Sequence, residues 1–459
     1  MVGFVSEPEI RSSAATVLSV ARHFAELRSR TELMLSTVQA SERGFFTPTE
    51  DDGVRQVLVS YWTARSALFE LMYTLRDAEY VEPDLHLAAI IVSYAAALIL
   101  VDAARFLREC FHHRPVVRAK LNEPEPAFGL PAGIYDQVQQ SLTSPYHIWH
   151  LYHAGRVVEE RHADALQLRD RFPQLAAIDD LIERLQDRLK VSTRDYAVAR
   201  IRANARAVRT VITSRLLVRA MYGLQKFVSQ MISGHFIRPG HVPQLPVEVA
   251  HELRQQLRPG DVLITRKEYA ITNYFLPGFW PHAALYMGTA EELTGLGLQT
   301  QSDFGRRWSG ILACDANVPG RVLEALKDGV HTRSVQCPLG SDAVAVLRPV
   351  LSGSEIASAL QRAIVHDGKP YDFDFDFTRS DRMVCTEVVY RTFDGIGGIQ
   401  FQLTRRAGRL TLSAEDLLNQ AVRRDGFHIH AVFCPGHSGS LEYSGKAEDI
   451  IRRTAKQQA

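Results

Sequence analysis

The stretch RPGHVPQLP, residues 238–246, limits what this chain can fold into because the sequence changes character there. Three prolines in nine residues end a long helical pattern and predict a stiff linker over 238–247. Helical spacing dominates before this stretch, and short β-type runs follow it. The sequence therefore predicts a multidomain protein, with an all-α domain at 1–237, an α+β domain at 248–440 and a C-terminal tail at 441–459.

The N-terminal half has apolar residues at three-to-four spacing, as in Leu58, Trp62, Leu68, Leu71 and Leu75. The run LAAIIVSYAAALILV at 87–101 has 15 uncharged residues. A bilayer needs roughly 20, so this run predicts a buried helix. The segment 114–133 contains four prolines and two glycines and predicts a loop between helical hairpins.

Composition narrows the class of protein. The 459 residues are 46% hydrophobic and 23% charged with a formal net charge of +1, which is typical of globular domains and gives no global reason to expect a nucleic-acid partner. The start, MVGFVSEPEIRSSAATVLSV, has no basic stretch before an apolar run, so no signal peptide is expected. The odd number of cysteines without C-x-x-C favours a reducing, cytoplasmic location over disulfides or structural zinc: Cys110, Cys314, Cys337, Cys385 and Cys434.

The C-terminal half alternates short strands with helical pieces, the pattern of an α+β domain with a small antiparallel sheet. The helical pieces include SEIASALQRAIVHDG (354–368) and CTEVVYRTF (385–393). The expected strands are DVLIT (261–265), HAALYMG (282–288), RVLEAL (321–326), AVAVLRPV (343–350) and FHIHAVF (427–433).

Cys385 stands immediately before the helical pattern TEVVYRTF. Val388, Val389 and Phe393 fall on one face of that helix, while Glu387 and Arg391 pair at i, i+4. The thiol would lie in the first helical turn, where free N–H groups and the helix dipole favour a thiolate. Most such cysteines are small core residues, so Cys385 is a candidate nucleophile only if a base lies near it.

His282 is the candidate base, because it opens an expected strand behind an apolar loop. Glu324 lies among apolar residues in the next expected strand, where an unpaired carboxylate would be unfavourable. An antiparallel pairing would bring Glu324 beside His282, able to fix the ring tautomer and favour the imidazolium. Cys385, His282 and Glu324 would then form a nucleophile, base and orienting acid.

At this point the sequence resembles a known family. The ordered blocks RPGDVLIT, LPGFWPHAALYMG, VLEALKDGV and GKPYDFDFDF followed by MVCTEVVYR are similar to the circularly permuted papain-like cysteine hydrolases, the YiiX/YebB branch of the NlpC superfamily. The resemblance covers roughly 250–435, and its order of histidine, acid and cysteine is that of the permuted branch. It implies Cys385 as nucleophile, His282 as base and Glu324 as third member.

The resemblance also implies that Tyr371 lines the active site. Its hydroxyl would help the Cys385 backbone N–H to bind the oxyanion. We expect the loop 269–281 to form one wall of a cleft in which Phe279 and Trp280 exclude water and offer an apolar surface to substrate. No cofactor or metal is expected.

Two metal-binding interpretations compete with this one. Asp372, Asp374 and Asp376 have calcium-loop spacing, but Phe377 stands where the loop needs glycine and Met383 where it needs glutamate. A calcium site is therefore not expected at these aspartates.

The helical half offers two E-x-x-H pairs, Glu109 with His112 and Glu159 with His162. Di-iron sites in helical bundles use two such pairs and two further glutamates, of which Glu70 could supply one. A helical metal oxidase is therefore an alternative function, with solvated helix faces as the simpler explanation.

The leading interpretation is a thiol hydrolase or acyltransferase that acts on an amide- or ester-linked acyl group. The apolar loop and the absence of an export signal favour an acylated or lipid-like substrate. The alternatives are a peptidoglycan-type peptide amidase and a non-catalytic ligand-binding or assembly module. Oligomeric state and the partner of the helical domain cannot be inferred from the sequence.

A basic segment ends the helical domain, since no acid occurs between Asp195 and Glu248. A basic amphipathic helix over 200–226 could rest on an anionic membrane, or pack into the helical core and pair with the acids of 159–195. Nucleic acid is not expected, because the arginines have no interleaved aromatic residues. The basic residues are Arg200, Arg202, Arg206, Arg209, Arg215, Arg219, Lys226 and Arg238, beside Leu217, Met221, Leu224, Val228 and Met231.

Overall fold

A computed structural model describes the protein over 5–77, 83–125, 128, 130–142, 145–189, 243–268, 279–313, 318–406 and 409–456. The chain divides into two compact units: Met1–Pro126 with Leu130–Val242, and Ala127–Gly129 with Pro243–Ala459. We call them the helical unit and the sheet unit. The basic segment 200–226, the linker residues 238–242 and the loop residues 269–278 lie outside the described residues.

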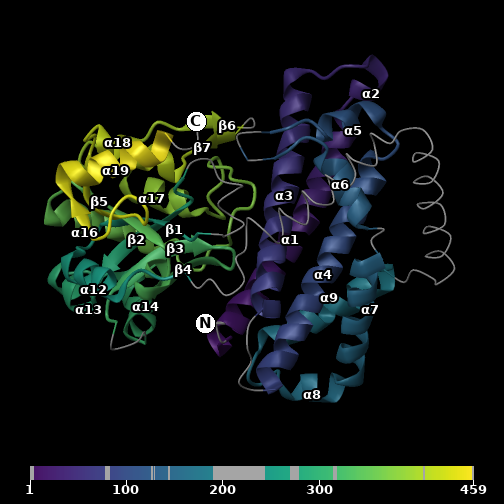
Figure 1. The fold of residues 1–459 in the computed structure, drawn as a ribbon, viewed down its shortest axis with the longest axis horizontal. Coiled ribbons are helices and arrows are strands. Elements are labelled where there is room, and N and C mark those ends of the chain that lie inside the picture. The colour runs from purple at the N-terminus through teal and green to yellow at the C-terminus, as the bar shows by residue number, and fades with distance from the viewer. Residues whose placement is uncertain are drawn as a thin grey trace. The chain divides into compact units, whose positions relative to one another are not determined.

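The helical unit is built on four long helices, α1, α3, α4 and α9, which pack lengthwise against one another (Figure 1). The helices described in this unit are α1 (Glu7–Thr37), α2 (Ala40–Arg43), α3 (Pro48–Asp77), α4 (Pro83–Phe111), α5 (Pro115–Leu121), α6 (Ile134–Ser141), α7 (Pro145–Glu160), α8 (His162–Gln167) and α9 (Gln174–Leu189). The first of them begins at a capping box in which Ser6 and Glu9 satisfy each other's backbone N–H groups.

Helix α4 carries the apolar run 87–101, and its side chains are mostly buried against α1, α3, α7 and α9. Among the described residues, its segment Asp84–Phe111 is the one helix long and apolar enough to cross a membrane, and 67% of its most apolar window is buried inside the protein. A buried helix of this composition is what the sequence predicts for 87–101.

The segment 114–133 differs from its prediction. It contains helix α5, which begins at Pro115, although its prolines predict a loop. Proline is well tolerated at the first helical position, where its missing N–H has no intrahelical partner to lose. The chain leaves the helix only after Asn122, and a short bridge joins Glu125 to Leu130.

The sheet unit contains a seven-stranded sheet in the order β4-β3-β2-β1-β5-β8-β9, and every adjacent pair is antiparallel. Its strands are β1 (Val262–Arg266), β2 (His282–Gly288), β3 (Arg321–Leu326), β4 (Gly329–Ser334), β5 (Ala343–Pro349), β8 (Phe427–Phe433) and β9 (Glu442–Tyr443). Strands β6 (Thr404–Arg406) and β7 (Arg409–Thr411) form a separate hairpin.

Both faces of the large sheet are covered, because alternate strand residues belong to two different apolar cores. One face packs on α12 (Val247–Gln256) and α15 (Gln336–Leu339). The other face packs on α13 (Ala290–Gly295), α14 (Ser302–Leu312), α16 (Gly353–Ile364), α17 (Cys385–Phe393), α18 (Ala414–Val422) and α19 (Ser444–Lys456).

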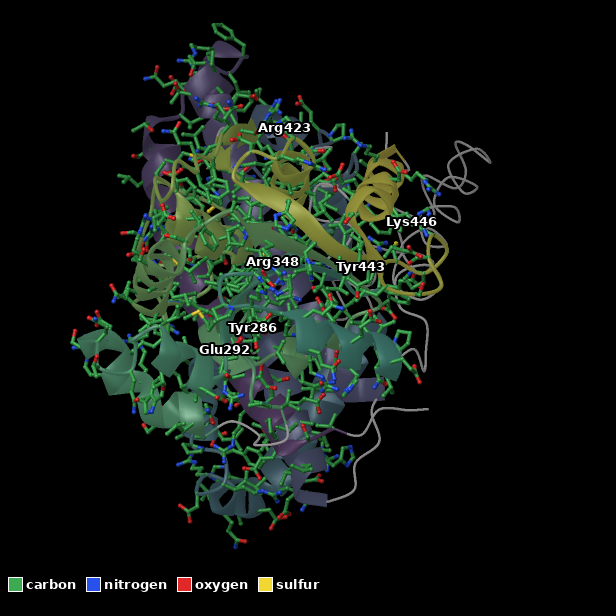
Figure 2. The ribbon with its side chains drawn as sticks, turned by 90° about the vertical axis from the view of Figure 1, so that its left-hand side faces the viewer. Tyr286, Glu292, Arg348, Arg423, Tyr443 and Lys446 are labelled. Atoms are coloured by element: carbon green, nitrogen blue, oxygen red, sulfur yellow. The ribbon has the colours of Figure 1, made fainter. Side chains whose placement is uncertain are left out.

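A polar network holds α12 to the sheet, and Figure 2 labels two of its members, Arg348 and Tyr443. Arg348 of β5 donates to both carboxylate oxygens of the buried Asp261 at 2.8 and 2.7 Å and to the Gln256 carbonyl at 2.7 Å. Gln256, at the end of α12, in turn donates to the Tyr443 hydroxyl at 2.7 Å. The entry to β1 is therefore fixed by buried hydrogen bonds as well as by apolar packing.

The predicted fold class is confirmed in its outline, since helices precede an antiparallel sheet. The five predicted strands correspond to β1, β2, β3, β5 and β8, while β4 and β9 were not predicted. The expected tail also contains structure, because α19 lies within 441–459 and packs its buried side chains into the sheet unit.

Candidate active site

Cys385 is the first residue of α17 and is 4% exposed. The preceding residue, Val384, has an extended backbone, so the chain enters the helix directly at the thiol. A parallel bridge pairs Met383 with Tyr371, and Met383 exchanges backbone hydrogen bonds with Pro370 and Asp372 at 3.0 Å. This anchoring fixes the position of the thiol at the free N-terminus of the helix.

His282 and Glu324 come from neighbouring antiparallel strands. The paired positions of β2 and β3 run from Leu285 opposite Leu323 to Gly288 opposite Arg321, so His282 lies three residues before the first of these pairs along β2. There the His282 Nε2 atom lies 2.8 Å from Glu324 Oε2. The imidazole is 22% exposed and the carboxylate side chain 1% exposed.

The Cys385 thiol interacts with the His282 ring and with the backbone N–H groups of Ala283 and Thr386. Since Glu324 occupies Nε2, the ring atom available to the thiol is Nδ1. The imidazole therefore interacts with both the thiol and the carboxylate, which come from α17 and β3, while the ring itself comes from β2.

The electrostatics of this chain favour a charged pair. Burial raises the pKa of the Cys385 thiol, but the imidazolium of His282, its hydrogen bond and the two backbone N–H groups outweigh burial and hold the pKa below its usual value. Burial lowers the pKa of His282, but the Cys385 thiolate and Glu324 raise it to about 9. Burial raises the pKa of Glu324, and hydrogen bonding to His282 more than offsets that effect.

Other cysteines have the opposite tendency. Burial raises the pKa of Cys110 and that of Cys434 to about 11. Burial and the nearby Glu324 carboxylate also raise the pKa of Cys337. Cys314 lies outside the described residues. Of the four described cysteines, Cys385 is therefore the one whose surroundings favour the thiolate.

The aromatic residues before His282 do not share one role. Trp280 is fully buried, and its indole N–H donates to Thr454 of α19 at 3.1 Å, so its side chain is part of the core, and its expected contact with substrate stays a prediction. Phe279 is partly buried, with the Arg266 guanidinium 4.2 Å from its ring centre. A substrate contact by Phe279 stays a prediction, because the loop residues 269–278 lie outside the described part of the chain.

Tyr371 is partly buried and stacks edge-on against Phe373 and Phe375, with ring centres 5.0 and 6.3 Å away. The bridge to Met383 places its backbone beside the segment that leads into Cys385. Its part in binding an oxyanion stays a prediction.

Two of the three aspartates of YDFDFDF, Asp372 and Asp376, hold the loop itself together. The Asp372 carboxylate accepts the backbone N–H groups of Asp374 and Asp376 at 3.0 and 2.6 Å, and Asp376 accepts that of Thr378 at 3.1 Å. Within the described residues, no group of three or more His, Cys, Asp or Glu side chains is arranged to hold a metal ion. The structure therefore gives the calcium and di-iron interpretations no support.

Sequence reasoning missed two neighbours of Glu324. The Nε atom of Arg333, in β4, lies 3.6 Å from Glu324 Oε1, and Cys337 of α15 interacts with the same carboxylate. The pair Asp328-Gly329 after β3 is a hairpin signal that could have predicted β4 and so the return of Arg333 towards Glu324.

Helix α17 also differs from expectation in one respect. Glu387 pairs with Arg391 at 2.6 Å as predicted from their spacing, but Glu387 is fully buried. Burial raises its pKa to about 8, although Arg391 opposes that shift. The polar side of α17 therefore faces the interior of the unit.

Comparison with known proteins bears on the sheet unit. Residues 256–436 match the model of the C92 family, described as "Permuted papain-like amidase enzyme, YaeF/YiiX". No curated protein and no solved structure gave a significant match to the chain. The resemblance predicted from the ordered motifs is thus confirmed: residues 256–436 are similar to the permuted papain-like amidases.

Proposed function

We propose that the sheet unit is a cysteine amidase that cleaves an acyl–nitrogen bond through a covalent thioester on Cys385. The observation that carries this proposal is that His282 lies 2.8 Å from the buried Glu324 and also interacts with the Cys385 thiol at the start of α17. The similarity of residues 256–436 to permuted papain-like amidases supports the same reaction class.

In the first half of the reaction, the Cys385 thiolate attacks the substrate carbonyl carbon and forms a C–S bond. The negative charge that develops on the carbonyl oxygen would be stabilised by the backbone N–H of Cys385 at the start of α17, with Tyr371 as the proposed second donor. The imidazolium of His282 donates its proton to the leaving nitrogen, the C–N bond breaks, and the amine departs.

In the second half, neutral His282 removes a proton from water, and the resulting hydroxide attacks the thioester. The C–S bond breaks, the acid is released, and the thiolate–imidazolium pair is restored. Glu324 keeps the ring oriented and stabilises its charge in both halves. An alcohol or amine in place of water would give acyl transfer, which product analysis distinguishes from hydrolysis.

The proposal also covers the class of substrate. An acylated or lipid-like amide is our preferred substrate, because an apolar loop precedes His282. A peptide amide is the main alternative. The membrane contact proposed for 200–226 would favour the lipid-like class.

The test is a panel of fatty-acyl amides, fatty-acyl esters and short peptide amides, incubated with wild-type protein and with Cys385→Ala. Turnover by the wild type, a mass increase equal to one acyl group on the peptide containing Cys385, and loss of both in the variant would support the proposal. Cys434→Ala is the matched control. Turnover that survives in Cys385→Ala would overturn the nucleophile assignment. If no substrate of the panel leaves an acyl group on the protein, a non-catalytic binding module is favoured.

A further inference from the structure

The two oxygens of the Glu324 carboxylate have different surroundings. Oε2 lies 2.8 Å from His282, whereas Oε1 is buried and has no hydrogen-bond partner in the described part of the chain. The nearest cation to Oε1 is Arg333, whose Nε atom lies 3.6 Å away and is likewise buried without a hydrogen bond. A buried carboxylate that must stay ionised needs charge compensation, and Arg333 supplies it on the side away from His282.

The fold fixes Arg333 in this place. Arg333 pairs with Val322 across β3 and β4, so its side chain shares a face with Glu324, two positions further along β3. Its Nη2 atom donates to Asp328 Oδ1 at 2.6 Å, and the Asp328 side chain is 6% exposed. Asp328 thereby fixes the Nη2 end of the guanidinium, and the Nε atom lies on the side of Glu324.

Other titratable groups also face Glu324. Cys337 of α15 interacts with the carboxylate, and His331 of β4 is its direct partner across the ladder. The His331 ring is turned towards the Asp328 carbonyl at 3.3 Å and Asp367 at 4.0 Å. Cys337 is uncharged when it carries its proton, so Arg333 is the neighbour that supplies a permanent positive charge.

We propose that Arg333 is a positioning residue that acts through Glu324, keeping this carboxylate ionised and directed at His282. The inference rests on the proposed roles of Cys385, His282 and Glu324. If Glu324 took up a proton, it could no longer stabilise the imidazolium, and the thiolate of Cys385 would lose its counter-charge. Arg333 therefore allows the thiolate–imidazolium pair to persist at lower pH.

The experiment measures the rate of Cys385 alkylation by iodoacetamide from pH 4 to pH 9, quantified by mass spectrometry of the Cys385 peptide. We expect Arg333→Gln to move the acidic limb of the profile upward by roughly one pH unit, because it removes a charge close to the carboxylate. Arg333→Lys should restore most of the wild-type profile. Arg333→Met, which keeps the apolar stem, is the second charge-free variant if Arg333→Gln does not fold.

Two controls separate positioning from a structural effect. His331→Gln, on the same strand, should leave the acidic limb in place. In a Glu324→Gln background, Arg333→Gln should cause no further shift, because the group through which it acts is already neutral. An unmoved limb in both charge-free variants, or an equal shift in the Glu324→Gln background, would overturn the proposal.

The same data distinguish this inference from the proposed function. If Cys385 of the wild type is alkylated no faster than Cys434 at pH 6, the thiolate–imidazolium pair itself is absent, and the proposed function fails. If Cys385 is reactive in the wild type but the Arg333 variants behave identically to it, only the inference about Arg333 fails.

Discussion

The two units of this protein use charge in opposite ways. Among the described residues of the helical unit, Glu125 is the one buried charged side chain, at 7% exposure. The sheet unit buries Asp261, Arg321, Glu324, Asp342, Asp372, Asp374, Arg382, Glu387 and Arg409. A buried charge is unfavourable unless it is paired. Such residues therefore indicate where the fold needs a defined geometry or a chemical group at the expense of stability.

Buried charge alone does not identify the site. Asp261 pairs with Arg348, Asp374 lies 3.7 Å from Arg409, and both pairs tie segments of the fold together. Glu324 differs because its partner is a histidine that also meets a thiol. The sheet unit therefore uses most of its buried charged residues for structure and one carboxylate for the candidate chemistry.

The largest expected effect concerns one cysteine from each unit. Cys385→Ala should reduce turnover at least about a thousandfold, because no other group can form the thioester. Cys110→Ala, in the helical unit, should leave turnover within about twofold of the wild type. Steady-state kinetics on the best substrate of the panel measure both rates. A Cys385→Ala variant that kept a tenth of wild-type activity would contradict the assignment of the chemistry to Cys385 of the sheet unit.

A smaller loss is expected when the buried carboxylate becomes neutral. Glu324→Gln should lower kcat roughly tenfold to a hundredfold with a lesser change in KM, because an amide cannot stabilise the imidazolium. Arg348→Gln, which disturbs a structural pair instead, should change kcat little in protein that remains folded. A wild-type rate in Glu324→Gln would place Glu324 among the structural charges.

The pH dependence of kcat/KM tests whether Glu324 acts on His282. Since the pKa of His282 is raised to about 9, the imidazolium persists through neutral pH, and kcat/KM should fall as the pH rises through about 9. Glu324→Gln removes one cause of the raised pKa, so the fall should begin at lower pH. A profile whose alkaline limb did not move in this variant would mean that Glu324 does not act on His282.

The last comparison concerns stability. Arg348→Ala leaves Asp261 buried without its cation and should cost about 3 kcal/mol in the free energy of opening at β5. Arg28→Ala removes a partly exposed pair with Asp102 in the helical unit, at 2.9 Å, and should cost about 1 kcal/mol at α4. Native-state hydrogen exchange measures both, and equal losses would contradict the difference between the units.

Much of this architecture could be predicted from local sequence. Strand runs such as HAALYMG and the helical spacing after Cys385 depend on residues close together in the chain, and the order of histidine, acid and cysteine was reached through the family resemblance. The side chains of His282 and Glu324 meet because β2 and β3 are sequential antiparallel neighbours. Local pattern and sheet topology agree there, which is why sequence reasoning reached these residues.

The remaining features depend on contacts between distant segments. The Trp280 indole N–H is satisfied by Thr454, 174 positions later, so nothing near Trp280 indicates that it is core. Burial of Glu387 likewise requires the packing of α17 into the interior of the unit. Arg333 looks like an ordinary charged strand residue until β4 folds back onto β3.

The most direct test of the thiolate–imidazolium pair compares the alkylation rates of the individual cysteines at pH 7 in the wild type and in His282→Ala. Iodoacetamide is small enough to reach a largely buried thiol, and peptide mass spectrometry reports each cysteine separately. We predict that Cys385 of the wild type reacts at least about tenfold faster than Cys110, Cys337 or Cys434, and that His282→Ala removes this advantage. Equal rates for all four cysteines in the wild type, or an undiminished rate at Cys385 in His282→Ala, would contradict the account.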